Sequence, residues 1–326
     1  MSAHSDYYDC NMQTRIVRYS HCLKQEWDSF VKESKNATFL FFRDYMDYHS
    51  DRFEDCSLLF FCDNRLIALL PANIDRRNNV LQSHAGLTYG GLIMSPDTRC
   101  SEIMQIFADL KEFMRKELGV NTLLYKPLPH IYCTHPAEEP LYALFCMGAK
   151  VASRSVSTTI DNSNRIKPSQ LRVRGAKKAR EYGITCSRSS RYSEFWKVLS
   201  STLMSQHGCT PVHTVKEIEI LQERFPDNIR LYTACNNGNG IVAGVVVYET
   251  ETVAHLQYIA ASPEGKECGA LDMLIMYIMD EYREKRYIDF GISTEQGGTI
   301  LNKGLIAQKE GFGGRAVVYD TYEIIV

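Results

Sequence analysis

Two segments near the end of the chain, "YIDFGIS" (287–293) and "KEGFGGR" (309–315), decide which fold the sequence predicts. The first reads as a buried strand that runs into polar residues. The second places Lys309 just before a group of glycines, which let the backbone approach another group closely. We therefore expect functional side chains to gather where the strand at 287–292 ends.

A strand, a loop and a helix precede these segments, in "HLQYIAASPEGKECGALDMLIMYIM" (255–279). The first turn of a helix exposes unpaired N–H groups and a partial positive charge, so it attracts phosphate. Glycines in such a turn can also serve the backbone conformation alone. On the phosphate interpretation, the residues that contact a phosphorylated ligand are Ala261, Ser262, Lys266, Gly269 and Ala270.

A strongly basic segment, 165–191, holds nine Lys or Arg residues and a single acid, Glu181. Arg174 and Lys177 lie on the polar face of the helix predicted at 169–182, where they can bind the phosphates of a donor or an acceptor. The same pattern also fits a helix face that only contacts solvent. The apolar face of this helix is predicted to hold Leu171, Gly175, Ala179 and Tyr182.

The chain of 326 residues reads as two halves with the same pattern of elements. Each half carries a few antiparallel strands, then a helix, a strand, a helix and a final strand. At roughly 100–200 residues per domain, this length suits two domains. The polar stretch "DNSNRIKPS" (161–169) separates the halves, so we expect an α/β fold with mixed sheets and domains at 1–160 and 161–326.

Composition and charge argue against several classes of protein. The net charge of −2 is not that of a chain that binds DNA or a membrane surface through its bulk charge. The eleven cysteines are scattered, without zinc-ligand or CxxC spacing, so we expect reduced thiols, no metal and a cytoplasmic protein. The N-terminus lacks a signal-peptide pattern, and no apolar run approaches the roughly 20 residues of a membrane span.

Taken in order, these segments resemble the FemAB-like transferases of the GNAT-type acyltransferase superfamily. The resemblance covers most of the chain and is strongest from 171 to 315. It implies two GNAT-like domains in tandem, with an acyl donor in a gap where the strands 255–261 and 287–292 splay apart. The segments that carry it are "SHAGLTYGGL", "LRVRGAKKAREYGI", "QHGCTPVHT", "VAGVVVYE", "LQYIAAS", "YIDFGIS" and "NKGLIAQKEGFGGR".

The resemblance implies an enzyme that transfers an acyl group to an amine. The leading expectation is an N-acyltransferase, such as an N-acetyltransferase, with acyl-CoA as co-substrate, no permanently bound cofactor and a small-molecule or peptide amine as acceptor. One alternative keeps the fold but takes an aminoacyl group from tRNA to a peptide or cell-wall-precursor amine. Another is a non-catalytic binding protein. The stretch from Lys266 to Leu271 departs from the usual acetyl-CoA pattern, which is Arg or Gln, two residues, Gly, one residue, then Gly or Ala.

Amine acylation needs an uncharged amine, hydrogen-bond donors for the developing oxyanion, and help for the leaving group. The resemblance points to Lys309 for stabilising the tetrahedral intermediate or the leaving group, and Asp289 is a candidate to orient the amine or act as base. Both also fit ordinary roles, Lys309 as a surface lysine that closes a helix and Asp289 as a carboxylate that orders a loop. The candidate substrate-binding residues are Arg174, Lys177, His207, Tyr258, Ser293 and Asn302.

Overall fold

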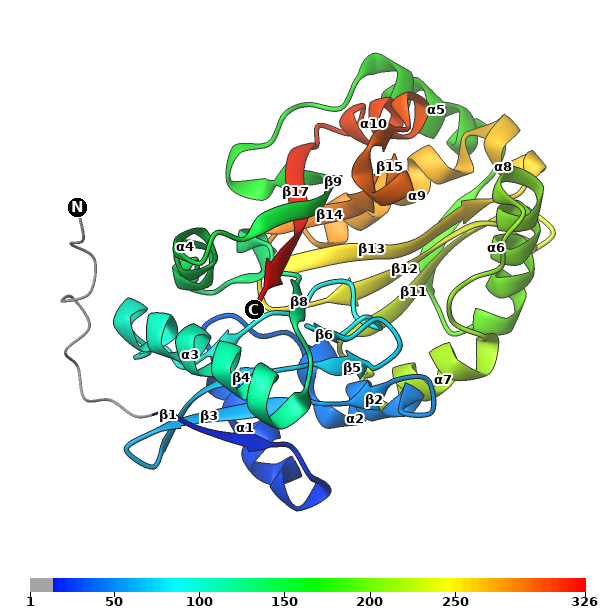
Figure 1. Cartoon of the computed structure of the whole chain (residues 1–326). Coiled ribbons are helices and arrows are strands. Elements are labelled where there is room, and N and C mark those ends of the chain that lie inside the picture. The colour runs from blue at the N-terminus through cyan, green and yellow to red at the C-terminus, as the bar shows by residue number, and fades with distance from the viewer. Residues whose placement is uncertain (1–13) are drawn as a thin grey trace. The chain divides into compact units, whose positions relative to one another are not determined.

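The computed structural model describes residues 14–326, without the side chains of His49 and His207, and divides into two compact units (Figure 1). Of the described residues, the first unit comprises 14–152 and 320–326, and the second comprises 153–319. Both combine helices with β-sheets, so the predicted mixed α/β fold is confirmed. No helix among the described residues is both long and apolar enough to cross a membrane.

The division between the units differs from the expected boundary between residues 160 and 161. That boundary falls at the end of strand β9 (Lys150–Asp161), whereas the compact units part between Ala152 and Ser153. The last strand, β17 (Arg315–Ile325), likewise begins in the second unit and ends in the first. The polar stretch 161–169 therefore lies inside the second unit.

The first unit contains two sheets that share a core with a long helix, α3 (Cys100–Phe113). Its other elements are β1 (Thr14–Arg18), α1 (Lys24–Glu33), α2 (Arg43–Met46), β2 (Glu54–Asp55), β3 (Leu58–Cys62), β4 (Arg65–Leu70), β5 (Asn73–Asp75), β6 (Val80–Gln82), β7 (Ile93–Met94), β8 (Thr122–Tyr125) and α4 (Glu139–Cys146). One sheet has the order β1-β3-β4-β7, and in the other the end of β17 is followed by β8, β6, β5 and β2. The segment "SHAGLTYGGL" (83–92) is the loop between β6 and β7.

The second unit is built on one mixed sheet. Its strands are β10 (Thr185–Ser189), β11 (Ile229–Cys235), β12 (Ile241–Glu249), β13 (Val253–Ala261) and β14 (Tyr287–Ile292), with a small pair formed by β15 (Thr294–Glu295) and β16 (Ile300–Leu301). Its helices are α5 (Gln170–Glu181), α6 (Tyr192–His207), α7 (Val215–Arg224), α8 (Pro263–Cys268), α9 (Ala270–Glu281) and α10 (Lys303–Glu310). The sheet runs in the order β10-β11-β12-β13-β14-β9, and only the pair β13–β14 in this series is parallel.

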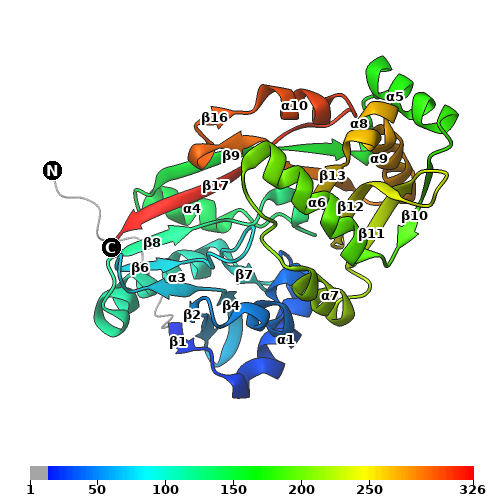
Figure 2. The ribbon, with the colours of Figure 1, turned by 90° about the vertical axis from the view of Figure 1, so that its right-hand side faces the viewer.

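Helices cover both faces of the sheet in the second unit (Figure 2). On one face, Ile275 and Ile278 of α9 share a buried core with Val245 of β12. The neighbouring residue, Gly244, points to the other face because side chains alternate along a strand. There α6 lies so close that a Cβ on Gly244 would come 2.3 Å from the Phe195 ring. Helices therefore pack closely on both faces of the sheet at Gly244 and Val245 of β12.

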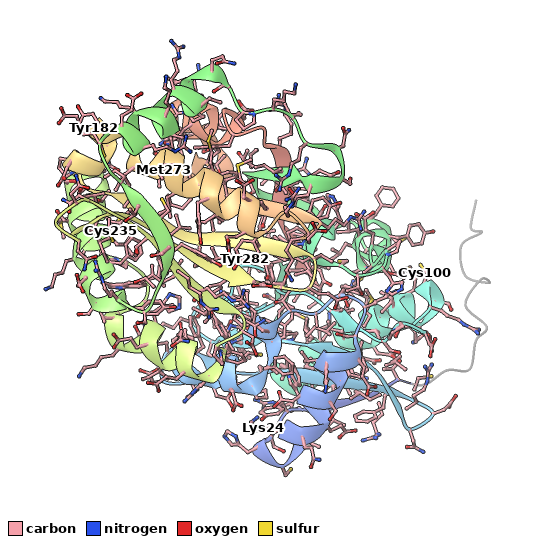
Figure 3. The ribbon with its side chains drawn as sticks, turned by 180° about the vertical axis from the view of Figure 1, so that it is seen from behind. Lys24, Cys100, Tyr182, Cys235, Met273 and Tyr282 are labelled. Atoms are coloured by element: carbon pink, nitrogen blue, oxygen red, sulfur yellow. The ribbon has the colours of Figure 1, made fainter. Side chains whose placement is uncertain are left out.

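Helix α5 packs against α9, and Figure 3 labels Met273 on α9 and Tyr182 just after α5. The buried residues of α5 are Ala176 and Ala179. Two residues predicted for its apolar face are instead exposed, Leu171 at 61% and Tyr182 at 54%. That part of the prediction is wrong because close contact with α9, and not the position of large apolar side chains, determines which face of α5 is buried.

The helix predicted within 255–279 begins differently in the structure. α8 ends at Cys268, Gly269 adopts a left-handed conformation with φ +81°, and α9 begins at the next residue. This conformation favours glycine. A Cβ at Gly269 would also lie 2.4 Å from the carbonyl oxygen of Gly175 on α5. The break therefore allows α5 to approach the start of α9 closely.

Candidate active site

The strands β13 and β14 pair with each other over only part of their length. Their parallel pairing begins at Val253 and Tyr287 and ends at His255 and Asp289. Beyond this point both strands continue, β13 as far as Ala261, without further pairing to each other in the described part of the chain. The splayed strands that the resemblance implies are therefore present in the second unit.

A cavity of about 270 Å³ lies where the two strands diverge. Apolar side chains from β13, β14, α9 and α10 form much of its lining, and Lys309 reaches it from α10. Such a cavity suits an extended apolar group, with a cation at one point of its wall. The apolar lining includes Ile259, Ala261, Leu271, Phe290, Leu305 and Phe312.

Lys309 is held at the cavity by the end of β14. Its Nζ atom donates hydrogen bonds to the carbonyl oxygens of Gly291, at 2.7 Å, and Ile292, at 2.8 Å. The residue is only 6% exposed. Burial penalises the charged amine and lowers the pKa of Lys309 to about 8, although the nearby Asp289 carboxylate opposes this. The interpretation of Lys309 as an ordinary surface lysine does not fit this burial.

Two local contacts fix the helix that carries Lys309. Asn302 caps the N-terminus of α10, because its side-chain oxygen accepts a hydrogen bond from the N–H of Leu305 at 3.0 Å. After the helix, the fully buried Phe312 stacks on Phe290 of β14 with ring centroids 5.7 Å apart. Asn302 thus has a structural role, and the packing of Phe312 brings the end of α10 against the strand that binds Lys309.

Asp289 is fully buried and accepts four hydrogen bonds from side chains. One oxygen accepts from Ser157 Oγ at 2.5 Å and Thr159 Oγ1 at 2.8 Å. The other lies 2.7 Å from His255 Nδ1 and 2.9 Å from the Tyr319 hydroxyl. Burial alone would raise the pKa of Asp289, but the hydrogen bond and charge of His255 and the two hydroxyls of β9 hold that pKa below its ordinary value. The carboxylate is therefore ionised and fixed, and it does not line the cavity.

Tyr258 forms a second buried polar contact on β13. Its hydroxyl lies 2.5 Å from His213 Nδ1, and its ring meets the edge of Trp196 with centroids 5.2 Å apart. Trp196 in turn donates a hydrogen bond from its indole N–H to the His213 carbonyl at 3.0 Å. These contacts give Tyr258 and His213 a role in holding the segment after α6 on the sheet.

The predicted phosphate site at the start of α9 is covered by α5. Ala270 is fully buried, and Asp272 in the first turn of α9 pairs with Arg172 of α5 at 2.6 Å. A Cβ on Gly175 would lie 2.0 Å from the Asp272 carboxylate, so the two helices are in close contact. A diphosphate can reach Ala270 only if α5 moves. The residues at this turn do not fit the usual CoA diphosphate site.

The other residues predicted to bind a phosphorylated donor lie nearer the cavity. Ala261 and Lys266 line it, and the Lys266 side chain is otherwise exposed. Ser262 caps α8, since its hydroxyl accepts a hydrogen bond from the N–H of Gly265 at 3.1 Å. Of the predicted set, the structure thus brings only Ala261 and Lys266 to the cavity, together with Lys309.

The predicted substrate-binding residues are scattered. Arg174 and Lys177 are exposed on α5 and do not line the cavity, and Lys177 lies 3.8 Å from Glu181. Ser293 is 1% exposed, and its hydroxyl has no hydrogen-bond partner among the described residues. The side chain of His207 lies outside the described residues. Ser293 follows the two residues whose carbonyls bind Lys309, but its buried side chain does not line the cavity.

Sequence reasoning missed most of the polar cluster around Asp289, namely His255, Ser157, Thr159 and Tyr319. His255 and Asp289 are each the third residue of a strand, and they face each other in the parallel register. A histidine and an aspartate at matching places of two adjacent parallel strands is the signal that could have found the pair.

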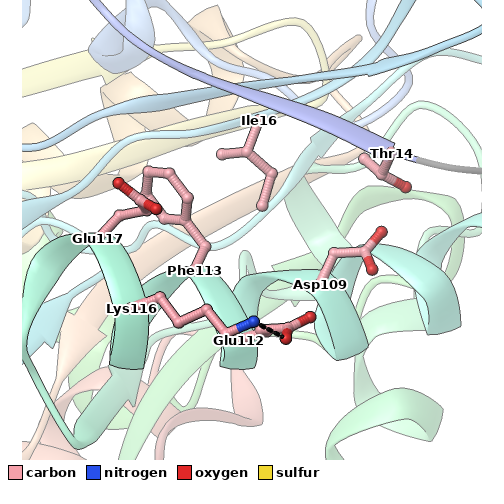
Figure 4. Close-up of a pocket in the computed structure, with 7 residues that line it drawn as sticks. All are labelled: Thr14, Ile16, Asp109, Glu112, Phe113, Lys116 and Glu117. Carbon is pink, nitrogen blue, oxygen red and sulfur yellow. Dashed lines mark ion pairs between the residues drawn. The ribbon is translucent and has the colours of Figure 1, made fainter.

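The first unit has a separate hollow of about 290 Å³ beside α3 (Figure 4). Its polar lining is mainly acidic, with Asp109, Glu112 and Glu117, and Lys116 is paired with Glu112 at 2.5 Å. None of the predicted site residues lies there. Within residues 14–326, no three His, Cys, Asp or Glu side chains are grouped so that they could hold a metal ion.

Residues 170–296 match the family model described as "Acetyltransferase (GNAT) domain". This match covers β13 and β14 and thus the two strands that form the cavity. It confirms the recognition of a GNAT-type domain in the second unit. The search among curated proteins found no match.

Several solved structures share the fold of the chain at low sequence identity. FemX matches with a TM-score of 0.66 and 12% identity, covering 96% of this chain and 97% of that chain. L-PGS from Bacillus licheniformis matches with a TM-score of 0.59 and 12% identity, covering 91% and 90%. A tandem GNAT protein from the clavulanic acid biosynthesis pathway matches with a TM-score of 0.50 and 13% identity, covering 96% and 98%. The shared fold is that of FemX and tandem GNAT proteins, and with the family match it supports an acyltransferase.

Proposed function

We propose that the second unit transfers an acyl group from an activated donor to the nitrogen of an amine. The observation that supports this most directly is the ammonium of Lys309, buried at an apolar cavity between two splayed strands. A fixed cation in such a place stabilises the negative charge that develops on a carbonyl oxygen during acyl transfer. The carbonyls of Gly291 and Ile292 hold the ammonium in position before the substrates arrive.

The pKa of Lys309 decides which role it can take. Since the pKa is about 8, most molecules carry the ammonium at pH 7. The residue therefore acts as a cation at neutral pH, and this action is lost as the pH rises through 8. Ser293 remains a predicted substrate contact: its buried hydroxyl has no hydrogen-bond partner among the described residues, and it does not line the cavity.

The first donor to test is an acyl-CoA, because the cavity suits an acyl chain and its thioester-bearing arm. Lys266 lies at the cavity and offers a positive charge to a phosphate. The covered first turn of α9 means that the diphosphate would bind outside Ala270, unlike the usual mode. The acceptor is a small molecule or a peptide with a primary amine.

A second candidate donor is the aminoacyl ester of a tRNA. Two observations support it as an alternative: the covered start of α9, and the exposed cations Arg174 and Lys177 on α5. Both donors present an activated carbonyl on a narrow arm, so the cavity and Lys309 would serve either. They differ in the size of the anionic surface that they present to the protein.

Ligand-dependent melting separates these candidates from a non-catalytic protein. The full chain is heated with acetyl-CoA, hexanoyl-CoA or charged tRNA, and transfer to hydroxylamine and to a panel of primary amines is followed by mass spectrometry. A donor at 100 times its dissociation constant adds about 2.7 kcal/mol, which raises the melting temperature by several degrees. Stabilisation with transfer supports the proposal. Stabilisation without transfer to any nucleophile would indicate a binding protein, and no stabilisation by any donor would contradict the proposal.

The salt dependence of tRNA binding tests the second donor separately. If Arg174 and Lys177 each contact a phosphate, replacing both with alanine reduces the slope of log affinity against log salt by about 2. Lys116→Ala, at an exposed lysine of the first unit, is the matched control. An unchanged slope in the double variant would remove α5 from tRNA recognition.

A further inference from the structure

Helix α5 of the second unit carries positive charge that its own contacts do not neutralise. Nine Lys or Arg residues and a single acid fall within 165–191. Arg174 and Lys178 are exposed and donate hydrogen bonds to the backbone carbonyls of Gln170 and Glu267. Because these carbonyls are uncharged, both positive charges remain. The exposed part of α5 therefore attracts an acidic partner.

Large apolar side chains lie exposed among these charges. Leu171 and Val173 of α5 are 61% and 43% exposed, and Tyr182, directly after the helix, is 54% exposed. Aliphatic side chains add little to the binding of a phosphate backbone, whereas protein interfaces combine apolar contacts with complementary charges. The surface thus suits an acidic protein better than an RNA. We name it the α5 surface; it includes Leu171, Val173, Arg174, Lys178, Arg180 and Tyr182.

Helix α5 contacts two of the elements that line the cavity. Lys178 Nζ donates a hydrogen bond at 2.7 Å to the carbonyl of Glu267 on α8, and the preceding residue, Lys266, lines the cavity. At the other end of α5, the N–H of Ser169 donates a hydrogen bond at 2.8 Å to the carbonyl of Gly311, where α10 ends. A partner bound to the α5 surface is therefore close to the walls of the cavity.

The cavity can take the arm of a donor without a site for a diphosphate. Helix α5 covers the first turn of α9, which the diphosphate of CoA would otherwise use. CoA joins its pantetheine arm to adenosine through that diphosphate. A carrier protein holds an acyl thioester on the same arm, but a single phosphate joins the arm to a serine. Such an arm needs the cavity and one cation near the phosphate, which the exposed Lys266 supplies.

We infer that the acyl donor is an acidic carrier protein, which binds the α5 surface and places its acyl-phosphopantetheine arm in the cavity. This inference rests on the proposed function and names its donor. In the transfer, the amine nitrogen bonds to the thioester carbon while Lys309 stabilises the oxyanion, and the bond from carbon to sulfur then breaks. The sulfur keeps the bonding pair and takes the proton that the nitrogen loses. The products are an amide and a carrier protein with a free thiol, so no other reactant is needed.

Three donors with the same hexanoyl thioester test the inference: a purified acidic acyl carrier protein, CoA, and pantetheine without phosphate. Transfer to hydroxylamine by the full chain is measured above the enzyme-free rate. We expect kcat/KM with the carrier protein to exceed that with CoA about 10-fold or more, since complementary charge speeds association. It should fall steeply with added salt, whereas kcat/KM with the uncharged pantetheine should depend little on salt.

Variants of the α5 surface test where the carrier protein binds. In Arg174→Glu/Arg180→Glu, the ratio of kcat/KM with the carrier protein to kcat/KM with hexanoyl-pantetheine should fall about 10-fold. Leu171→Ser removes an apolar contact without changing charge and should lower the same ratio, which a surface that binds only phosphates would not show. The control Lys32→Glu/Arg115→Glu, at exposed cations of the first unit, should keep the wild-type ratio.

The same assays separate failure of this inference from failure of the proposed function. Faster transfer from hexanoyl-CoA or from charged tRNA than from the carrier protein would overturn the inference alone. A preference for the carrier protein that the α5 variants keep would overturn it too, because the partner would then bind elsewhere. No transfer from any of these donors would overturn the proposed function as well.

Discussion

Replacing Lys309 with methionine separates the function of its charge from its effect on stability. Methionine keeps the length and the apolar stem but removes the ammonium. The drop in the Lys309 pKa from 10.5 to about 8 corresponds to about 3 kcal/mol by which burial penalises the charged form. Against this relief stands the loss of the hydrogen bonds to the carbonyls of Gly291 and Ile292, at about 1–3 kcal/mol for each carbonyl left unsatisfied. Because the opposing contributions are of similar size, we expect the free energy of unfolding at pH 7 to change by less than about 2 kcal/mol.

The effect on turnover should be much larger. Loss of one preorganised donor for an oxyanion costs about 100- to 1,000-fold in kcat. We therefore expect Lys309→Met to reduce transfer by this factor with little change in the donor dissociation constant. Transfer to hydroxylamine and to a primary amine, with donor binding by calorimetry, measures both quantities.

The pH dependence of stability gives an independent check of the same residue. The folded pKa lies below the unfolded one, so the penalty is fully present below about 8 and is relieved as the pH rises toward 10.5. Wild type should thus gain up to about 3 kcal/mol relative to Lys309→Met between pH 8 and 10.5, measured by urea unfolding. An equal difference between the two proteins at pH 7 and pH 10, or an unchanged turnover in the variant, would refute the reasoning.

Three further predictions concern the frame of the site. Gly175→Ala should lower the stability by about 1–3 kcal/mol, because the new Cβ would lie 2.0 Å from Asp272. The control Gly304→Ala on α10 meets nothing closer than 3.8 Å and should be tolerated. Equal melting temperatures for the two variants would argue against the close packing of α5 on α9. Phe312→Ala should cost about 3–5 kcal/mol in urea unfolding, since the ring is fully buried against β14, and a loss below about 1 kcal/mol would contradict this packing. The lowered pKa of Asp289 adds stability above pH 3.8 that is lost as the pH falls through the folded pKa. Wild type should therefore lose more stability than Asp289→Asn in acid. An equal loss in both proteins, measured by urea unfolding as the pH is lowered, would contradict this.

Local patterns in the sequence predicted many elements well and tertiary contacts poorly. The strands predicted at 255–261 and 287–292 and the helix predicted at 169–182 correspond closely to β13, β14 and α5, because apolar periodicity and turn residues define them locally. The pattern of 255–279 predicted one helix after the loop and missed the break at Gly269 between α8 and α9, since that break depends on contact with a distant helix. The exposed face of α5 was misread for the same reason.

The candidate site was predicted in part. Lys309 was predicted as a catalytic residue from the resemblance carried by the segments around it. Its burial at a cavity agrees with a direct role. His255 was missed because its partner, Asp289, is 34 residues away and only the sheet register brings the two together. Arg174 was favoured for its charge, although charge on a helix says little about which face is near a cavity. A polar pair formed by residues of two different strands is therefore harder to predict from one sequence than functional residues within one segment.

The most direct measurement is electron density for a bound donor analogue. Crystals are soaked with a stable thioether analogue of hexanoyl-CoA and, separately, with an amide analogue of an aminoacylated adenosine. We expect density for the acyl part of at least one analogue along β13 beyond His255, with its carbonyl oxygen within hydrogen-bond distance of Lys309 Nζ. Density for both analogues outside the gap between β13 and β14, or an empty gap with both at saturating concentration, would contradict the proposal that acyl transfer takes place there.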